Sequence, residues 1–317
     1  MPESSVLGEK MEQLARECTP VPDVTISIIN TNNRQMTLDC LRSVFANTHH
    51  ATLEVCVVDN ACTDGSAEAI RTDSPQVRLI CNERRLGFST NNNLVFRQAQ
   101  GCYLLMLNDD TLIQPGALDR MVEFMDAHPE AGVVGAKLLN PDGSNQPAFS
   151  RFYGPIGDLV LKPVHLRLTA GRYDVGDSTE VDAVGGACML IRHEAAEQVG
   201  YLDPTFDPLY SEEIDWCFRI REAGWKIYHL PQAMVIHYGS QTMNRAPLTK
   251  LEQLHRGKTR FFLKHFGVTG AWCYKVTLFV LSVFKVLFYG LTSVVNCRSA
   301  VQKVRINWHI AKRAFFL

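Results

Sequence analysis

The sequence predicts an α/β protein with a mainly parallel central sheet, and three observations support this fold class. Apolar runs rich in β-branched residues alternate with stretches of helical periodicity from residue 24 onward. Their spacing is that of βαβ units, which make successive strands parallel. Three of the expected strands end in polar residues, which are Thr31, Asp59 and Asp110. Because open α/β sheets bind ligands at the carboxyl ends of their strands, this edge is expected to hold a nucleotide and a metal ion.

The expected elements follow one another in a regular order. Strands are predicted over residues 24–29, 53–58, 77–81 and 104–107, each a short apolar run bounded by turn residues. Helices are predicted between them, over residues 36–45, 66–71 and 87–99. A short polar helix from Glu9 to Glu17 is expected before the first strand.

The fourth strand ends abruptly at three polar residues, Asn108, Asp109 and Asp110. Two adjacent carboxylates and an amide can hold a hard divalent cation, which prefers oxygen ligands and often shares them with substrate phosphates. The alternative is a solvated turn after a core strand.

Charge is unevenly distributed along the chain. The 317 residues suffice for one large domain or a domain with an appendage, and the formal net charge is −1. From Lys250 onward there are twelve basic residues and one acidic residue, so the first 249 residues carry twenty basic and thirty-two acidic ones. We therefore expect a leader (1–22), a main domain (23–250) and a basic helical tail (251–317) that meets an anionic partner.

The ten cysteines include no pair at metal-binding spacing, and several lie inside apolar runs, such as Cys56, Cys102 and Cys188. This usage predicts a reduced, cytoplasmic chain with cysteines in its core. The first 23 residues lack the apolar core of a signal peptide.

Residues 276–295 are apolar and long enough to span a bilayer, but Lys285 lies at their centre. Polar residues recur there at helical spacing and form one stripe, which comprises Lys275, Ser282, Lys285, Tyr289, Thr292, Asn296 and Lys303. The pattern predicts an amphipathic helix that lies in an anionic membrane surface. A helical hairpin that buries its apolar face in a homodimer is the first alternative, and a full span is the second.

Several motifs, in order, resemble those of family 2 glycosyltransferases, in particular the bacterial rhamnosyltransferase-like branch. They cover about residues 24–245 and comprise residues 57–66, Gly87-Phe88 with Asn92-Asn93, residues 107–111, residues 186–192, residues 211–219, Pro231 and His237. The resemblance implies a GT-A fold, in which a Rossmann-like nucleotide half merges with an acceptor half. It also implies that residues 141–177, which lack periodicity, form an acceptor-side loop.

The resemblance implies roles for individual residues. Asp59 would accept a hydrogen bond from the base of the donor, and Asp110 would bind Mg²⁺ or Mn²⁺. His237 would be a further metal or diphosphate ligand, and Glu213 would be the general base. Other positions would bind the nucleotide (Thr31, Asn92, Asn108, Asp109) or support catalysis (Glu212, Asp215).

Two positions depart from the family pattern, and several have structural alternatives. Asn32 stands where many relatives carry an aromatic residue, and Glu213 stands where many carry aspartate. Asp59 and Asp64 could cap a helix, and His237 could be structural. The acids 212, 213 and 215 could form the first turn of a helix, favoured by its dipole, and could pair with Arg219.

Taken together, the sequence predicts a metal-dependent, inverting glycosyltransferase, peripheral at the cytoplasmic face of the plasma membrane. Its donor would be a dTDP-, UDP- or GDP-sugar, with dTDP-rhamnose first, and its acceptor a lipid-linked saccharide of the cell envelope. The rivals are a nucleotidyltransferase, which lacks its usual phosphate loop here, and an inactive homologue that serves as a membrane scaffold. Nucleic-acid binding is not expected, because the basic residues are interleaved with an apolar helix.

Overall fold

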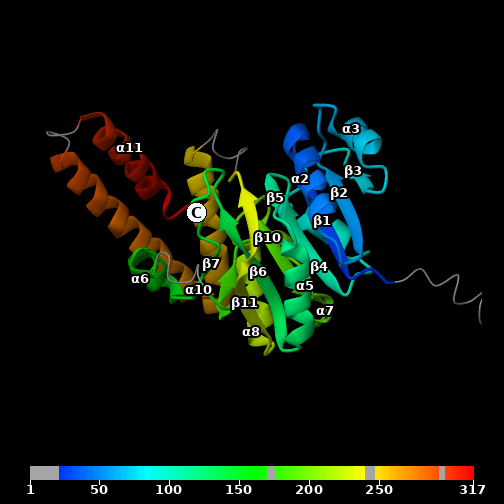
Figure 1. Cartoon of the computed structure of the whole chain (residues 1–317). Coiled ribbons are helices and arrows are strands. Elements are labelled where there is room, and N and C mark those ends of the chain that lie inside the picture. Colours follow the sequence, from blue (N-terminus) through cyan, green and yellow to red (C-terminus); the bar gives the residue numbers. More distant parts are fainter. Residues whose placement is uncertain (1–20, 170–175, 240–246, 293–296) are drawn as a thin grey trace, which may run out of the picture.

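The computed structural model describes residues 21–169, 176–239, 247–292 and 297–317, so the expected helix at Glu9–Glu17 lies outside the described residues. A nine-stranded sheet forms the centre, in the order β3-β2-β1-β4-β10-β6-β11-β5, with β8 beside β11 (Figure 1). Its strands are β1 Val24–Asn30, β2 Leu53–Asp59, β3 Arg78–Cys81, β4 Tyr103–Asn108, β5 Thr111–Ile113, β6 Ala131–Leu139, β8 Thr179–Glu180, β10 Cys188–Arg192 and β11 Lys226–His237. Two further strands, β7 Phe149–Ser150 and β9 Ala183–Val184, pair separately.

The four strands predicted from the sequence form the parallel half of this sheet, β3-β2-β1-β4. The second half is mixed, because β10 runs antiparallel to both β4 and β6, whereas β11 is parallel to β6. The predicted α/β fold is confirmed, and the strands after β5 complete it.

Helices cover both faces of the sheet because the strands are apolar on both faces. Along β4, Leu105 and Leu107 pack into one core, whereas Leu104 and Met106 pack into the other. The first core includes α2 Arg34–Asn47, α3 Ser66–Asp73 and α5 Ala117–Ala127. The second includes α4 Phe88–Phe96, α7 His193–Val199 and α8 Glu212–Glu222.

Two sequence expectations were wrong. The stretch 141–177 was expected to be a loop, but it contains α6 Gly154–Thr169, a 16-residue helix that packs against α10. Pro163 inside this helix obscures its periodicity. Cys102 is exposed, whereas Cys56 and Cys188 are buried as expected.

The C-terminal region is a helical hairpin, α10 Pro247–Thr292 and α11 Cys297–Arg313, which extends from the sheet (Figure 1). The backbone of α10 leaves helical geometry at Gly267, where φ is 68°. The part of α10 before Gly267 packs on the main domain and contributes Phe261 and Phe262 to a third core. Position 251, the predicted domain boundary, therefore falls inside a helix, and the division of domains stays a prediction.

The polar stripe of α10 is partly covered, because Ser282 is buried and the Lys275 ammonium donates to the Phe315 carbonyl beyond α11. The apolar face of the hairpin is consequently turned outward, with Phe284 65% and Leu287 62% exposed. By length and composition alone, residues Leu248–Leu291 could cross a membrane.

Candidate active site

The predicted site residues meet because the strands that carry them are in register. Asn30 at the end of β1 pairs with Asp59 of β2, and Ile29 pairs with Asn108 of β4. In the second half of the sheet, His237 at the end of β11 pairs with Thr111. All these strand ends open into one cleft of about 700 Å³. The cleft lining includes Thr31, Asn108, Asp109, Asp110, Glu212, Glu213 and His237.

Asp110 and His237 form the predicted metal pair at the floor of the cleft. The Asp110 carboxylate is buried, and its Oδ1 lies 3.3 Å from Nε2 of His237. The same Nε2 is 3.4 Å from Nδ2 of Asn108. The Tyr238 backbone N–H donates to the carbonyl of Asp110, which ties the two segments together.

Gln146 fixes the orientation of the His237 ring, a role that no motif or periodicity in the sequence indicates. Its amide nitrogen donates to the carbonyl of His237 at 2.6 Å and to Oδ1 of Asn140 at 2.7 Å. Its Oε1 therefore faces Nδ1 of His237 at 2.9 Å and must accept the ring proton. Nε2 is therefore the ring nitrogen that faces the Asp110 carboxylate, and it is the one available as a metal ligand.

This donor set fits a divalent cation, because a carboxylate oxygen and the nitrogen of a neutral imidazole are both metal ligands and here lie side by side. Among the described residues, no group of three His, Cys, Asp or Glu side chains converges. Asp110 and His237 would therefore supply two ligands and leave the remaining positions to diphosphate oxygens and water, as Mg²⁺ sites commonly do.

Gln146→Leu is expected to weaken metal affinity by about 10–100-fold, the usual cost of losing the partner that orients a histidine ligand. The measurement is a Mn²⁺ titration followed by electron paramagnetic resonance. Gln35→Leu, on the exposed surface of α2, is the matched control. Equal Mn²⁺ affinity in both variants would contradict the orienting role.

Asp59 has one carboxylate oxygen that is available to accept a hydrogen bond from a ligand. Its Oδ1 accepts the Cys62 backbone N–H at 2.9 Å, whereas its Oδ2 is buried without a hydrogen-bond partner among the described residues. A buried carboxylate oxygen without a donor is costly, so a ligand N–H would stabilise it. Thr31 lies nearby, where Asn60 Nδ2 approaches its hydroxyl at 3.4 Å.

Asp64 has a structural role at the start of two helices, in agreement with the helix-cap alternative. Its carboxylate accepts the backbone N–H groups of Arg34 and Ser66 and joins the start of α2 to that of α3. Asn92 is fully buried, and its amide donates to the Phe88 carbonyl, so the structure does not bring its side chain into the cleft. Asn91 lines the cleft instead.

Asp109 lines the cleft next to Asp110 and is hydrogen-bonded to the residue that precedes α2. It is buried, and its Oδ2 accepts the amide of Asn33 at 3.1 Å. Burial, together with the adjacent negative charge of Asp110, raises the pKa of Asp109 to about 7. The two acids of this turn are therefore not equivalent, because Asp110 meets the histidine while Asp109 secures the start of α2.

Glu212 and Glu213 open α8 and line the cleft. Burial, and then the charge of Glu213, raise the pKa of Glu212 well above its usual range. Burial also raises the pKa of Glu213, but the nearby cations Lys162 and Lys258 oppose that shift. The two lysines therefore act in favour of the ionised form of Glu213, whereas the negative charge of Glu213 acts against ionisation of Glu212.

The backbone before α8 is constrained. Tyr210 and Ser211 both have positive φ, 82° and 75°, a conformation that non-glycine residues rarely adopt. On the opposing helix, a Cβ at Gly257 would lie 2.2 Å from the Tyr210 carbonyl oxygen. The glycine therefore lets α10 approach the turn that aims Glu212 and Glu213.

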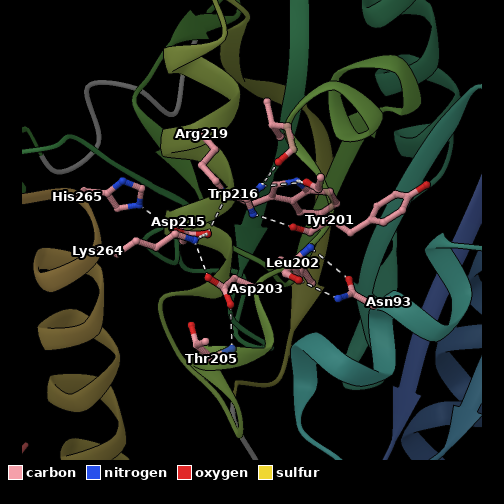
Figure 2. A network of polar contacts seen from close by, with 12 residues as sticks. Asn93, Tyr201, Leu202, Asp203, Thr205, Asp215, Trp216, Arg219, Lys264 and His265 are labelled. Carbon is pink, nitrogen blue, oxygen red and sulfur yellow. Dashed lines mark hydrogen bonds and ion pairs between the residues drawn. The ribbon is translucent and has the colours of Figure 1, made fainter.

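Asp215, a predicted supporting acid, does not line the cleft. It is fully buried in a polar network on the opposite side of α8, where Arg219 contacts it at 2.9 Å and His265 at 2.7 Å (Figure 2). Lys264 bridges it to Asp203. The partnership expected between Arg219 and an acid of this turn is confirmed. The contacts of Asp215 with Lys264 and His265 join α8 to α10.

The architecture defines a class of enzyme, the GT-A glycosyltransferases. The chain is similar to a mannosyltransferase from Pyrobaculum calidifontis in complex with GDP-Man and Mn²⁺, with a TM-score of 0.60 and 14% identity over 98% of this chain and 94% of that one. It is also similar to GalNAc-T7 with UDP, GalNAc and Mn²⁺, with a TM-score of 0.55 and 18% identity. That match covers 69% of this chain and 44% of the GalNAc-T7 chain.

Residues 25–200 match the family model of glycosyl transferase family 2, and the chain belongs to that family. It is 30% identical to the N-acetylglucosaminyl-diphospho-decaprenol L-rhamnosyltransferase of Mycobacterium tuberculosis over 236 residues, which are 68% of this chain and 76% of the relative. It is 24% identical to the rhamnosyltransferase WbbL of Escherichia coli over 186 residues, 56% of this chain and 70% of the relative. The predicted family and enzyme class are confirmed.

Proposed function

We propose that the protein is a metal-dependent, inverting glycosyltransferase that moves rhamnose from a nucleotide-sugar donor to a lipid-linked saccharide. The observation that carries this proposal is one cleft whose lining includes Asp110 and His237 together with Glu213. One group of residues suits a departing diphosphate, and the other suits an attacking hydroxyl.

In this mechanism Glu213 takes the proton of the acceptor hydroxyl as that oxygen attacks the anomeric carbon of the donor. General-base catalysis of this kind is typically worth about 10²–10⁴ in rate. The bond from the anomeric carbon to the diphosphate breaks on the opposite face, so one displacement inverts the anomeric centre. A Mg²⁺ or Mn²⁺ ion held by Asp110 and His237 would act as a Lewis acid for the leaving diphosphate.

Asp59 and Thr31 would contact the base of the donor, in line with the unpaired carboxylate oxygen of Asp59. Rhamnose is the proposed sugar because two relatives carry rhamnosyltransferase names. The lipid-linked acceptor rests on the first of them, whose name gives an N-acetylglucosaminyl-diphospho lipid. Assembly of a surface polysaccharide is the corresponding process.

A thermal-shift panel tests the donor. dTDP-rhamnose with Mn²⁺ is expected to raise the melting temperature of the protein more than UDP- or GDP-sugars, because a ligand that binds only the native state stabilises it. EDTA should remove the difference. Turnover with a GlcNAc-diphospho-lipid, followed by NMR of the product anomer, then tests inversion. If a GDP-sugar alone stabilised the protein, the rhamnose assignment would be wrong.

We also propose that the protein lies on the cytoplasmic face of the plasma membrane. Its exposed apolar side chains gather on three helices that adjoin one another, α6, α10 and α11. They include Ile156, Leu161, Val164, Phe284, Leu287, Leu291 and Trp308. A surface of this kind is favourable only when it is covered, and basic residues around it favour anionic lipid over a second protein chain.

Leu287→Asp is expected to reduce the fraction of protein that floats with anionic liposomes by about tenfold or more. The substitution removes a leucine whose transfer from water into the lipid would be worth roughly 1.5–3 kcal/mol. Val21→Asp is the matched control, because Val21 is 61% exposed against 62% for Leu287 but lies before β1. A wild type that fails to float and forms a stable dimer in light scattering would replace the membrane proposal by the dimer alternative.

A further inference from the structure

A second cavity lies outside the catalytic cleft, in the bend of α10. It has a volume of about 380 Å³ and is lined by both halves of the helix and by residues 316 and 317. Three of its lining residues are cationic, Arg256, Arg260 and Lys275, and we call this cavity the basic groove.

The positive charge of the basic groove is not neutralised within the described residues. Arg260 donates to the backbone carbonyl of Asp207, and Lys275 donates to that of Phe315, but none of the three cations forms an ion pair with an acidic residue in the described part of the chain. Burial and the neighbouring charge of Arg256 both lower the pKa of Arg260. The Asp207 carboxylate is already engaged by the Ser89 N–H and the Thr90 hydroxyl.

Three other cations of the same two helices have acidic partners. Lys258 pairs with Asp158, Lys264 with Asp203, and Arg313 with Glu252. The groove is therefore a local concentration of positive charge, and close like charges are unfavourable unless an anion joins them.

The remaining walls of the groove are apolar and open to solvent. Trp272 is 54% exposed and Phe316 is 82% exposed, and the rest of the apolar lining comprises Leu263, Val268, Ala271 and Leu317. A ligand that satisfies both kinds of wall must carry negative charge next to a hydrocarbon chain. Lipid phosphates have that combination of properties.

The groove and the catalytic cleft are lined by successive positions on one face of α10. Thr249 and Gln253 line the cleft, whereas Arg256 and Arg260 line the groove. These positions are spaced by four, three and four residues, which places them on the same side of a helix. With a rise of about 1.5 Å per residue, Gln253 of the cleft and Arg256 of the groove are less than one helical turn apart.

We propose that the basic groove binds the phosphate groups that join the acceptor saccharide to its lipid. The lipid chain would leave along Trp272 and Phe316 toward the membrane-facing surface, and the saccharide would extend along α10 into the cleft. This assignment rests on the proposed function, because it takes the acceptor to be lipid-linked. It gives α10 a specific recognition site in addition to its apolar surface.

The test uses farnesyl diphosphate, a short isoprenoid diphosphate without a sugar, and measures its binding by isothermal titration calorimetry. EDTA is present so that no metal ion in the cleft attracts the diphosphate. Arg256→Gln with Lys275→Gln is expected to weaken binding about tenfold or more, since charged hydrogen bonds are worth roughly 1.5–3 kcal/mol each. This pair leaves the bond from Arg260 to the Asp207 carbonyl intact.

Arg305→Gln with Lys312→Gln is the matched control, because it removes the same charge from exposed positions of α11 outside the groove. This control should bind farnesyl diphosphate as the wild type does, and inorganic diphosphate should bind the wild type at least about tenfold more weakly. Equal losses in both variant pairs, or no loss in either, would overturn the proposal. Displacement of farnesyl diphosphate by phosphatidylglycerol vesicles at equal phosphate concentration would assign the groove to bulk lipid instead.

The donor thermal-shift panel, repeated on the same variants, separates the two proposals. Donor stabilisation without farnesyl diphosphate binding would leave the transferase standing and remove the groove. Groove-dependent binding without stabilisation by any nucleotide sugar would retain a lipid-phosphate site and remove the proposed function.

Discussion

Asp110→Asn is expected to lower kcat for sugar transfer by about 10²–10³-fold or more. The substitution removes the charged ligand that faces Nε2 of His237, and a Lewis-acid metal contributes several kcal/mol to such a reaction, with about 1.4 kcal/mol for each factor of ten. Initial rates at saturating donor and varied Mn²⁺ measure the effect. The Mn²⁺-dependent part of the donor thermal shift should disappear in the same variant.

Asp142→Asn provides the control for this loss. Asp142 lies in an exposed turn after β6 and accepts hydrogen bonds from Ser144 outside the cleft. It should retain wild-type rates and the full metal response. An Asp110→Asn enzyme that turned over at the wild-type rate in EDTA would refute metal-assisted departure of the diphosphate.

Glu213→Gln is expected to lower kcat by about 10²–10⁴-fold while donor binding remains, because glutamine keeps the shape of the side chain but cannot accept a proton. Glu222→Gln, at the exposed end of the same helix, should be unaffected. Glu212→Gln should cost much less than Glu213→Gln, because burial and the charge of Glu213 raise the pKa of Glu212 and so favour its neutral form, which glutamine resembles.

The pH profile gives a second readout for Glu213. The base works only when it is ionised, and burial raises its pKa, so kcat/KM should fall as the pH drops through a value above the usual glutamate range. Lys162→Met removes a cation that lowers this pKa, so the acid limb should move to higher pH. A limb that stays in place after Lys162→Met would show that this lysine does not act on the base.

The parallel half of the fold could be predicted because its signals are local. Each of the first four strands is a short apolar run, and the polar residues that follow β1, β2 and β4 line the cleft, as Thr31, Asn60 and Asp110 show. The approach of His237 to Asp110 could not be read from spacing, because 127 positions separate them and only the antiparallel pairing of β11 with β5 brings them together.

Gln146 and the lysines near Glu213 were missed for a related reason. Their roles depend on which side chain each one faces across the fold, and neither composition nor periodicity contains that information. Asp215 illustrates the converse error. It stands two residues after Glu213 in an acidic motif, but the helical turn of about 100° per residue directs it to the other side of α8, toward Lys264 and His265.

The network around Asp215 joins the helix of the proposed base to the helix that carries the apolar surface. If that surface rests on lipid, the height of Glu213 above the bilayer is a fixed property of the folded chain. The enzyme would then transfer sugar only to an acceptor hydroxyl that lies at that distance from the bilayer. A lipid-linked chain longer by one sugar would present a different residue there, so acceptor length would be selected by geometry as well as by recognition of the sugar.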